Sequence, residues 1–182
     1  MSSRTSGCAI GSEAGFDAQP TLRGELVEVR PLRQDDYDAL YAAASDPLIW
    51  EHHPDDRWRE DVFRPFFAEH LATGGALAVL DARSGTVIGT SRYHDYDPER
   101  SEVEIGWTFI ARAYWGGTYN GELKRLMLEH AFRSVDTVIF VVAPGNLRSQ
   151  RAVEKLGAVR AGTRHDDVRG ERLVFALRRQ RR

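Results

Sequence analysis

The sequence is poor in cysteine, in long apolar runs and in net charge, and each shortage excludes a class of protein. Its only cysteine, Cys8, excludes a disulfide within the chain and a thiol-rich metal site. No segment approaches the roughly 20 consecutive apolar residues that a membrane-spanning helix needs, so we expect no membrane association. The formal net charge of −2 gives no general attraction to nucleic acid.

The composition and its distribution along the chain indicate one folded domain. With 182 residues, 42% of them hydrophobic, the chain is long enough for one core and too short for two ordinary domains. Residues 1–20 are rich in small and polar residues and lack the apolar centre of a signal peptide. We therefore predict a flexible tail over 1–20, a single domain over 21–182, and a cytoplasmic protein.

The periodicity of the apolar residues divides the domain into strands and helices. Strands are predicted where apolar and polar residues alternate or where a short apolar run is continuous, and helices where apolar residues recur every three or four positions. The predicted strands cover 26–32, 76–82, 86–96, 101–110, 137–142, 158–167 and 171–179, and the predicted helices cover 35–45, 55–75, 122–132 and 146–157. This order indicates an α/β fold with one mixed β-sheet and helices on both faces.

The strand predicted over 101–110 is expected to present two different faces. Strict alternation predicts one face with Val103, Ile105, Trp107 and Phe109, and an opposite face with Glu102, Glu104, Gly106 and Thr108. The final hairpin is expected to turn near Arg169 and Gly170.

Two strand–helix junctions near the centre of the predicted sheet have features of ligand-binding sites. In YWGGTYNG (114–121), the adjacent Gly116 and Gly117 allow a tight turn that directs several N–H groups at one point before a helix, which suits a diphosphate. In APGNLRS (143–149), Asn146 can cap the next helix, with Ser149 as its third residue. On local evidence an ordinary turn and an ordinary capped helix explain these residues at least as well.

Three segments share their order and spacing with one known family. VAPGNLRSQRAVEKLGA (142–158) matches a strand–Asn–helix segment, and LRGELVEVRPLRQDDYDALYAA (22–43) matches an opening strand and helix. EVEIGWTF (102–109) is followed by AYWGG (113–117) and LKRLMLEHAF (123–132). Together they resemble the GNAT acetyltransferases, in the branch that contains ribosomal-protein N-terminal acetyltransferases, over about residues 22–178.

The resemblance implies the transfer of an acetyl group from acetyl-CoA to an amine, without a metal. In the family, backbone groups of the central strand pair with the pantetheine arm, the glycine loop wraps the diphosphate, and the Asn–helix segment contacts the arm near its sulfur. The cofactor-binding residues implied here are Trp107, Thr108, Phe109, Trp115, Gly116, Gly117, Thr118, Tyr119, Asn120, Asn146 and Ser149. Candidates for the CoA phosphates are Arg112, Lys124, Arg125, Arg148 and Arg151.

The sequence departs from the family pattern at three positions. Ala113 stands where the diphosphate loop has Gln or Arg, and Thr118 replaces its final small residue, so we expect Arg112 to compensate. Val153 stands where many relatives have a tyrosine that protonates the departing thiolate. Ser149 is then the remaining candidate acid.

An amine with a pKa of roughly 10 must lose a proton before it attacks a thioester, so the reaction needs a base. We expect Glu104 to be that base, at the end of the central strand beside the region implied for the acetyl group; the alternative is a salt-bridged or exposed carboxylate. The acceptor amine is expected to contact the loop EHHPDDRW (51–58) and the strand end YHDYD (93–97). The candidates there are His52, His53, Trp58, Tyr93 and Asp95.

Other readings stay open at this point. The acceptor is either a protein N-terminus or a small-molecule amine, and another acyl-CoA can replace acetyl-CoA as donor. A non-catalytic acyl-CoA-binding or regulatory module explains the altered loop and the missing tyrosine as well. A homodimer through the edge strands of the closing hairpin is also possible.

Overall fold

The computed structural model describes residues 15–53, 55–167 and 170–180. Three short 3-10 helices occur at Gln34–Asp36, Pro47–Ile49 and Arg112–Tyr114. The α-helices are α1 (Tyr37–Ala44), α2 (Glu60–Ala72), α3 (Thr118–Ala131) and α4 (Leu147–Lys155). The strands are β1 (Leu22–Arg23), β2 (Val27–Pro31), β3 (Ala76–Asp81), β4 (Val87–Asp97), β5 (Glu102–Ile110), β6 (Thr137–Val142), β7 (Val159–Asp166) and β8 (Gly170–Arg178).

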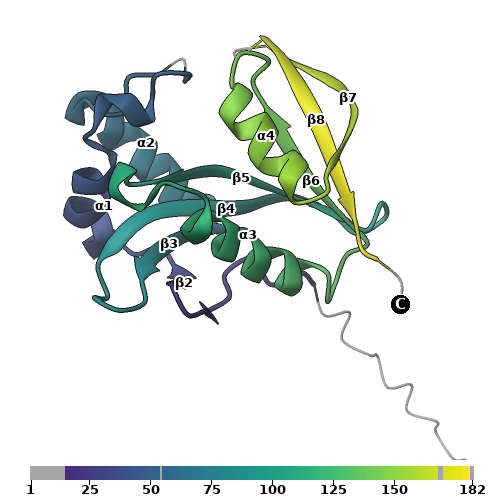
Figure 1. The fold of residues 1–182 in the computed structure, drawn as a ribbon, viewed down its shortest axis with the longest axis horizontal. Coiled ribbons are helices and arrows are strands. Elements are labelled where there is room, and N and C mark those ends of the chain that lie inside the picture. Colours follow the sequence, from purple (N-terminus) through teal and green to yellow (C-terminus); the bar gives the residue numbers. More distant parts are fainter. Residues whose placement is uncertain (1–14, 54, 168–169, 181–182) are drawn as a thin grey trace, which may run out of the picture.

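The described strands form a single mixed sheet in the order β1-β2-β3-β4-β5-β6-β8-β7 (Figure 1). Neighbouring strands are antiparallel except β5 and β6, which are parallel because α3 returns the chain across the sheet between them. The predicted α/β fold with a mixed sheet is confirmed, and so is the predicted order of its elements. The sequence prediction missed β1 and placed the start of α3 at 122, one turn after its start at Thr118.

Two hydrophobic clusters lie on opposite faces of the sheet. One joins α3 and α4 to the sheet through residues such as Leu123, Met127 and Val153. The other joins α1 and α2 to the opposite face through Leu40 and Phe63. Helices therefore cover both faces, and the central strands between them are shielded from water on both sides.

Strands β5 and β6 separate soon after they begin to pair. Their register runs only from Glu102–Thr137 to Glu104–Ile139, although β5 continues to Ile110. Beyond Glu104 the β5 backbone keeps its partner β4 on one side, and its other edge has no strand partner among the described residues. Figure 1 shows β6, β8 and β7 diverging from the rest of the sheet at this point.

A β-bulge at Trp107 overturns the strict alternation that we expected along β5. The pairing with β4 shifts between Thr90 and Arg92, and Trp107 has φ 49, a left-handed conformation that is strained for a bulky residue. The bulge reverses the faces: Ile105 belongs to the cluster under α3 and α4, whereas Phe109 belongs to the cluster under α1 and α2. Odd-numbered residues of β5 therefore point to one face of the sheet before the bulge and to the other face after it.

The first described residues pack on the domain. The ring of Phe16 makes edge contacts with Tyr93 and His130, at centroid distances of 5.0 and 5.7 Å. Of the tail predicted over 1–20, residues 1–14 lie outside the described residues, and so does Arg169 of the predicted turn. No helix among the described residues is long and apolar enough to cross a membrane.

Candidate active site

Glu104 lies at the point where β5 and β6 separate. It is 5% exposed, and because its neighbours Val103 and Ile105 pack in the cluster under α3 and α4, its side chain points to the opposite face of the sheet. Arg164 of β7 donates a hydrogen bond to its Oε2 atom over 3.4 Å, and His94 Nε2 lies 3.1 Å from its Oε1 atom. The carboxylate is thus buried between one permanent cation and one titratable ring, neither of which the sequence prediction paired with it.

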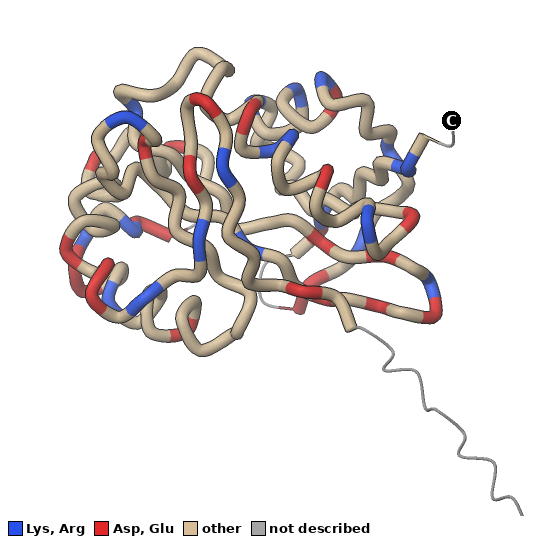
Figure 2. Tube along the Cα trace, turned by 90° about the horizontal axis from the view of Figure 1, so that it is seen from below, with Lys and Arg blue, Asp and Glu red and all other residues tan. Residues whose placement is uncertain are grey.

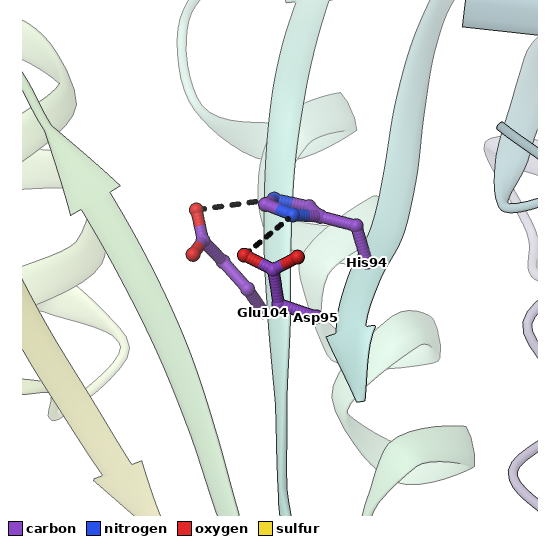
Figure 3. A group of neighbouring side chains, drawn as sticks. All are labelled: His94, Asp95 and Glu104. Atoms are coloured by element: carbon purple, nitrogen blue, oxygen red, sulfur yellow. Dashed lines mark ion pairs between the residues drawn. The ribbon is translucent and has the colours of Figure 1, made fainter. Parts of the chain in front are cut away.

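His94 and Asp95 extend this contact toward the surface (Figure 3). His94 is the cross-strand partner of Glu104 in the β4–β5 register, and its Nδ1 atom lies 3.3 Å from Asp95 Oδ2. The spacing of the three side chains would also suit a metal ion. We assign no metal to them, because the Arg164 guanidinium already lies beside Glu104 and within 4.0 Å of Asp95.

Gly106 has no side chain and so allows His94 and Glu104 to lie close to the β5 backbone. A Cβ atom built at Gly106 would lie 3.2 Å from His94 Nε2 and 3.6 Å from Glu104 Oε1. The next residue, Trp107, meets the His94 ring edge-on at 4.6 Å, and the guanidinium of Arg92 lies 3.8 Å from the Trp107 ring centre. The Glu104 carboxylate, the His94 imidazole and the Gly106 backbone thus lie together beside the Trp107 ring, and we call this group the cradle.

The loop after β5 turns into α3 through two glycines in the left-handed region. Gly116 and Gly117 have φ 118 and 101, a conformation that costs other residues energy. Gly117 is the N-cap of α3 and supplies no side-chain cap, and Thr118 is the first helical residue. No N-cap side chain accepts a hydrogen bond from the first N–H groups of α3. These groups lie at the positive end of the helix dipole. Tyr119 and Asn120 follow in its first turn.

The start of α4 has the cap that the sequence predicted. Asn146 is its N-cap, and its Oδ1 atom accepts a hydrogen bond from the Ser149 N–H group at 3.0 Å. This prediction is confirmed. The capping bond uses the backbone of Ser149, so the Ser149 hydroxyl is not needed for the cap. The α3 and α4 starts follow β5 and β6, the two strands that separate.

Arginines connect the segments at the open edge. The Arg148 guanidinium lies 4.0 Å from the Trp115 ring centre, which joins the first turn of α4 to the loop before α3. Arg148 also donates to the Ile49 carbonyl at 3.3 Å. Arg112, which we expected to compensate in the phosphate loop, forms an ion pair with Asp46. Arg151 is exposed on α4.

The residues proposed for the acceptor pocket are distributed unevenly. Asp95 joins Glu104 through His94, as described above. His53 packs edge-on against Trp50, whose ring centre lies 5.0 Å from that of Phe109, so His53 of the predicted 51–58 loop is connected through Trp50 to the end of β5. His52 and Trp58 lie at the surface of this loop.

Tyr93 lies away from this site. It is 1% exposed, lies in the cluster under α3 and α4, and donates from its hydroxyl to the Met127 carbonyl at 2.6 Å. Its assignment to the acceptor pocket conflicts with this position, because neighbouring residues of a strand point to opposite faces and it is His94 that lies beside Glu104.

Lys124 is the other departure from the sequence prediction. We expected it at the surface as a candidate for the CoA phosphates, but it is 6% exposed. Its Nζ atom donates to Thr108 Oγ1 at 2.6 Å and lies 3.5 Å from Ser91 Oγ, on the α3 face of the bulge. Burial lowers the pKa of Lys124 to about 7.

Charge is mixed over the described chain. Figure 2 shows acidic and basic positions interspersed along the trace. Most of the charged side chains beside the candidate site make ion pairs with each other, such as Arg112 with Asp46 and Arg164 with Glu104.

Comparison with known proteins identifies the fold. Residues 27–159 match the model of the acetyltransferase (GNAT) domain family. A GCN5-related N-acetyltransferase from Brucella melitensis superposes with a TM-score of 0.78 at 21% identity, covering 88% of this chain and 79% of that one. A Vibrio cholerae protein described as a candidate ribosomal-protein-serine acetyltransferase gives 0.73 at 14% identity, covering 90% and 100%.

A third similar structure is a spermidine N-acetyltransferase chimera from Vibrio cholerae and a human enzyme, with a TM-score of 0.65 at 16% identity, covering 85% of this chain and 96% of that one. No curated protein matches the sequence. At these identities the structures show a shared fold, whereas the family model spans more than half of the chain. The chain therefore belongs to the GNAT family of acetyltransferases.

Proposed function

We propose that this protein transfers an acetyl group from acetyl-CoA to a primary amine, by direct attack of the amine within a complex of both substrates. Membership of the GNAT family supports acyl transfer in general. The observation that carries the proposal is the position of Glu104: a buried carboxylate at the point where two parallel strands separate, in the cradle beside His94 and Gly106.

The residues at the open edge fit an acyl-CoA. The free edge of β5 beyond Glu104 offers backbone N–H and C=O groups to an amide-containing arm such as pantetheine, at Trp107, Thr108 and Phe109. The left-handed Gly116–Gly117 turn and the uncapped start of α3 offer N–H groups to a diphosphate. Asn146 and Ser149 begin α4 after β6, so we propose that they contact the arm from the other side of the open edge.

Glu104 acts in this proposal as the base that prepares the amine. The ammonium loses one proton to the carboxylate, and the lone pair of the resulting amine attacks the thioester carbonyl. The C–S bond breaks as the amide forms, and the second nitrogen proton ends on the departing thiolate. Burial of Glu104 among fixed partners holds its oxygens in place for this step. The Ser149 hydroxyl stabilises the departing thiolate by donating a hydrogen bond, a smaller contribution because a thiol has a pKa near 8.5.

The acceptor is a primary amine that reaches the cradle past the predicted 51–58 loop. His52, His53 and Trp58 border this approach in the proposal, and Asp95 provides a negative charge for a cationic amine. Two acceptor classes remain, protein N-termini and small amines such as polyamines. We expect the protein to be a cytoplasmic enzyme without nucleic-acid or membrane partners. Dimerisation through the edge strand β7, which pairs only with β8 among the described strands, is a further prediction for gel filtration.

The test is acetyl-CoA turnover with a panel of polyamines, amino acids and N-terminal peptides, following free thiol release and the mass of the product. The proposal expects thiol release that depends on the amine and an amide product 42 Da heavier, roughly the mass of an added acetyl group. Acetyl-CoA binding by calorimetry without turnover on any amine would favour a non-catalytic acyl-CoA-binding module. Faster turnover with succinyl-CoA would name a different donor.

A further inference from the structure

We propose that Lys124 stabilises the CoA thiolate that departs when the acetyl group is transferred, by donating a hydrogen bond to its sulfur. The inference rests on the proposed function, because the thiolate arises in that reaction. It makes Lys124 a catalytic residue that acts from the α3 side of the sheet, in addition to the contribution proposed for Ser149 of α4.

The side chain of Lys124 reaches from α3 to the place where β5 and β6 separate. Its Nζ atom donates a hydrogen bond to Thr108 Oγ1 on β5 at 2.6 Å and lies 5.9 Å from the centre of the Phe140 ring on β6. The last residues that pair β5 with β6 are Glu104 and Ile139, and Thr108 and Phe140 follow them. Nζ therefore lies near both strands at a level where they no longer pair.

This position is beside the strand segment proposed for the reacting end of the cofactor arm. The arm is proposed to pair with the free edge of β5 around Thr108, with its thioester near Glu104. The start of α3 at Thr118, proposed for the diphosphate, is roughly 9 Å away from Lys124 along the helix axis. The sulfur is therefore the part of acyl-CoA that we assign to Lys124.

Lys124 has one N–H group left for a ligand. The two acceptors of its Nζ atom are hydroxyl oxygens, those of Thr108 at 2.6 Å and of Ser91 at 3.5 Å. Both hydroxyls donate their own protons to the Gly106 carbonyl, at 3.4 and 3.5 Å, so their oxygens accept from Nζ. A lysine ammonium has three N–H groups, and among the described residues the third has no recorded acceptor.

The positive charge of Lys124 has no compensating anion in the part of the chain that the structure describes. The residue is 6% exposed, and burial is the one cause that lowers its pKa to about 7, without a contribution from a neighbouring charge. A neutral side chain would avoid the cost of burying this amine. A thiolate beside Nζ would raise the pKa of Lys124 again and hold it in the charged form.

The facing helix α4 does not supply such a charge. Val153 packs in the same cluster as Phe140, and its aliphatic side chain has no proton to donate. Ser149 offers a hydroxyl group, which is neutral. A cation from α3 therefore complements the hydroxyl group from α4.

The assigned step leaves Lys124 charged. When the C–S bond breaks, its electron pair stays on the sulfur, and the Lys124 ammonium donates a hydrogen bond to that sulfur. The second proton of the acceptor nitrogen then neutralises the thiolate, as in the proposed function. Lys124 keeps its own proton throughout, so no further reactant is needed.

The direct test is the pKa of the CoA thiol in its complex with the protein, which requires no turnover. The ultraviolet absorbance of the thiolate is followed from about pH 6 to 9.5, with desulfo-CoA, which lacks the sulfur, as the blank. Because a lysine cation favours the thiolate, we expect the bound thiol to titrate about one pH unit or more below the roughly 8.5 of a free thiol.

Two variants distinguish the charge of Lys124 from its packing. Lys124→Gln keeps a hydrogen-bond donor toward Thr108 without a charge, and Lys124→Met fills a similar volume with neither. Both should lose the lowering of the thiol pKa, and kcat should fall about 10-fold or more with the KM for acetyl-CoA within about 3-fold of wild type. Lys155→Met on α4 is the matched control and should keep wild-type values, because Lys155 is exposed.

A second measurement needs no substitution at position 124. Lys124 and Lys155 are the only lysines of the sequence, so carbon-13 NMR of labelled lysine gives two signals, which Lys155→Met assigns. Binding of CoA should raise the pKa of Lys124 above its value with desulfo-CoA, because only CoA brings a thiolate. Equal values with the two ligands overturn the inference.

The outcomes separate this inference from the proposed function. A bound thiol with the pKa of free CoA, or a lowered pKa that persists in folded Lys124→Gln, overturns the role of Lys124 even if acetyl transfer is observed. If wild type transfers no acetyl group to any amine, the proposed function fails, and the two titrations still decide whether Lys124 contacts the thiolate. If calorimetry detects no CoA binding, both fail.

Discussion

The Nζ atom of Lys124 donates a hydrogen bond to Thr108 Oγ1 at 2.6 Å, at the bulge that interrupts β5. Among the described residues no carboxylate pairs with this buried amine. Two hydroxyl groups, those of Thr108 and Ser91, are its recorded hydrogen-bond partners. Burial without a counter-ion lowers the pKa of Lys124 to about 7, so the amine changes charge near neutral pH.

This burial predicts a stability that depends on pH above neutrality. The folded-state pKa of Lys124 is about 7 and its unfolded value about 10.4, so the unfolded chain binds more protons between these limits. The free energy of unfolding should therefore rise with pH from about 7 toward 10, by up to about 1.4 kcal/mol per pH unit. Urea unfolding of Lys124→Met should lack this rise. An equal slope in both proteins contradicts the prediction.

The burial of His70 predicts that the free energy of unfolding also depends on pH in the acidic range. Burial is the main cause that lowers its pKa to about 3, with the positive charge of Arg92 as a further cause. Thr90 donates its hydroxyl proton to the Leu77 carbonyl at 2.6 Å, so His70 Nε2 must donate to Thr90 Oγ1 and the ring is neutral. The unfolded state binds more protons between about pH 6.5 and 3, and stability is lost as the pH falls through this range.

The measurement is urea unfolding of wild type and His70→Gln between pH 4.5 and 7.5. Wild type should lose up to about 1.4 kcal/mol per pH unit below 6.5 from this group, and His70→Gln should lose less. The two pH windows of His70 and Lys124 do not overlap, so each variant is a control for the other. If His70→Gln loses as much free energy of unfolding per pH unit as wild type, groups other than His70 cause the loss at acidic pH.

Substitutions at Asn146 and Ser149 distinguish a contribution to helix capping from a contribution to acetyl transfer. Asn146→Ala removes the acceptor of the Ser149 N–H group and should reduce the free energy of unfolding by about 1 kcal/mol. Ser149→Ala keeps that backbone bond, so its stability should stay near wild type while thiolate departure slows, by less than about 10-fold in kcat. Thermal unfolding and turnover of both variants check this. Equal loss of stability in the two variants would contradict the separation.

Gly106→Ala tests the cradle. The added methyl group would lie 3.2 Å from His94 Nε2 and 3.6 Å from Glu104 Oε1, in the space proposed for the amine. We expect kcat/KM for the amine to fall about 10-fold or more, with calorimetric acetyl-CoA affinity within about 3-fold of wild type. Gly121→Ala on α3 is a matched control, because a Cβ there meets no other atom within 4 Å. An unchanged kcat/KM would place the amine elsewhere.

The sequence predicted the parts of the fold that depend on local patterns. Continuous apolar runs such as 137–142 and the cap at Asn146 depend on neighbouring residues only, and both were predicted correctly. The bulge was not predictable in this way, because a positive φ at Trp107 arises from pairing with β4 and has no signature in its own segment. That one residue changed which face the end of β5 presents.

The contacts within the candidate site were only partly predictable from the sequence, for the same reason. Glu104 was singled out as a polar residue on the central strand, but its partner His94 comes from the register of the β4–β5 hairpin. Lys124 had a signal that was missed: it shares an inward stripe with Met127 and Ala131, at helical spacing. Counting inward positions without regard to polarity would have placed this lysine in the core.

The most direct test of the account is acetyl transfer by Glu104→Gln, a substitution of nearly equal size that cannot accept a proton. Turnover with the best amine of the panel, acetyl-CoA affinity by calorimetry and thermal unfolding are measured on the same samples as wild type. The account predicts a kcat lower by on the order of 10²-fold or more, with acetyl-CoA affinity and fold retained. A folded Glu104→Gln protein that turns over at the wild-type rate would contradict it.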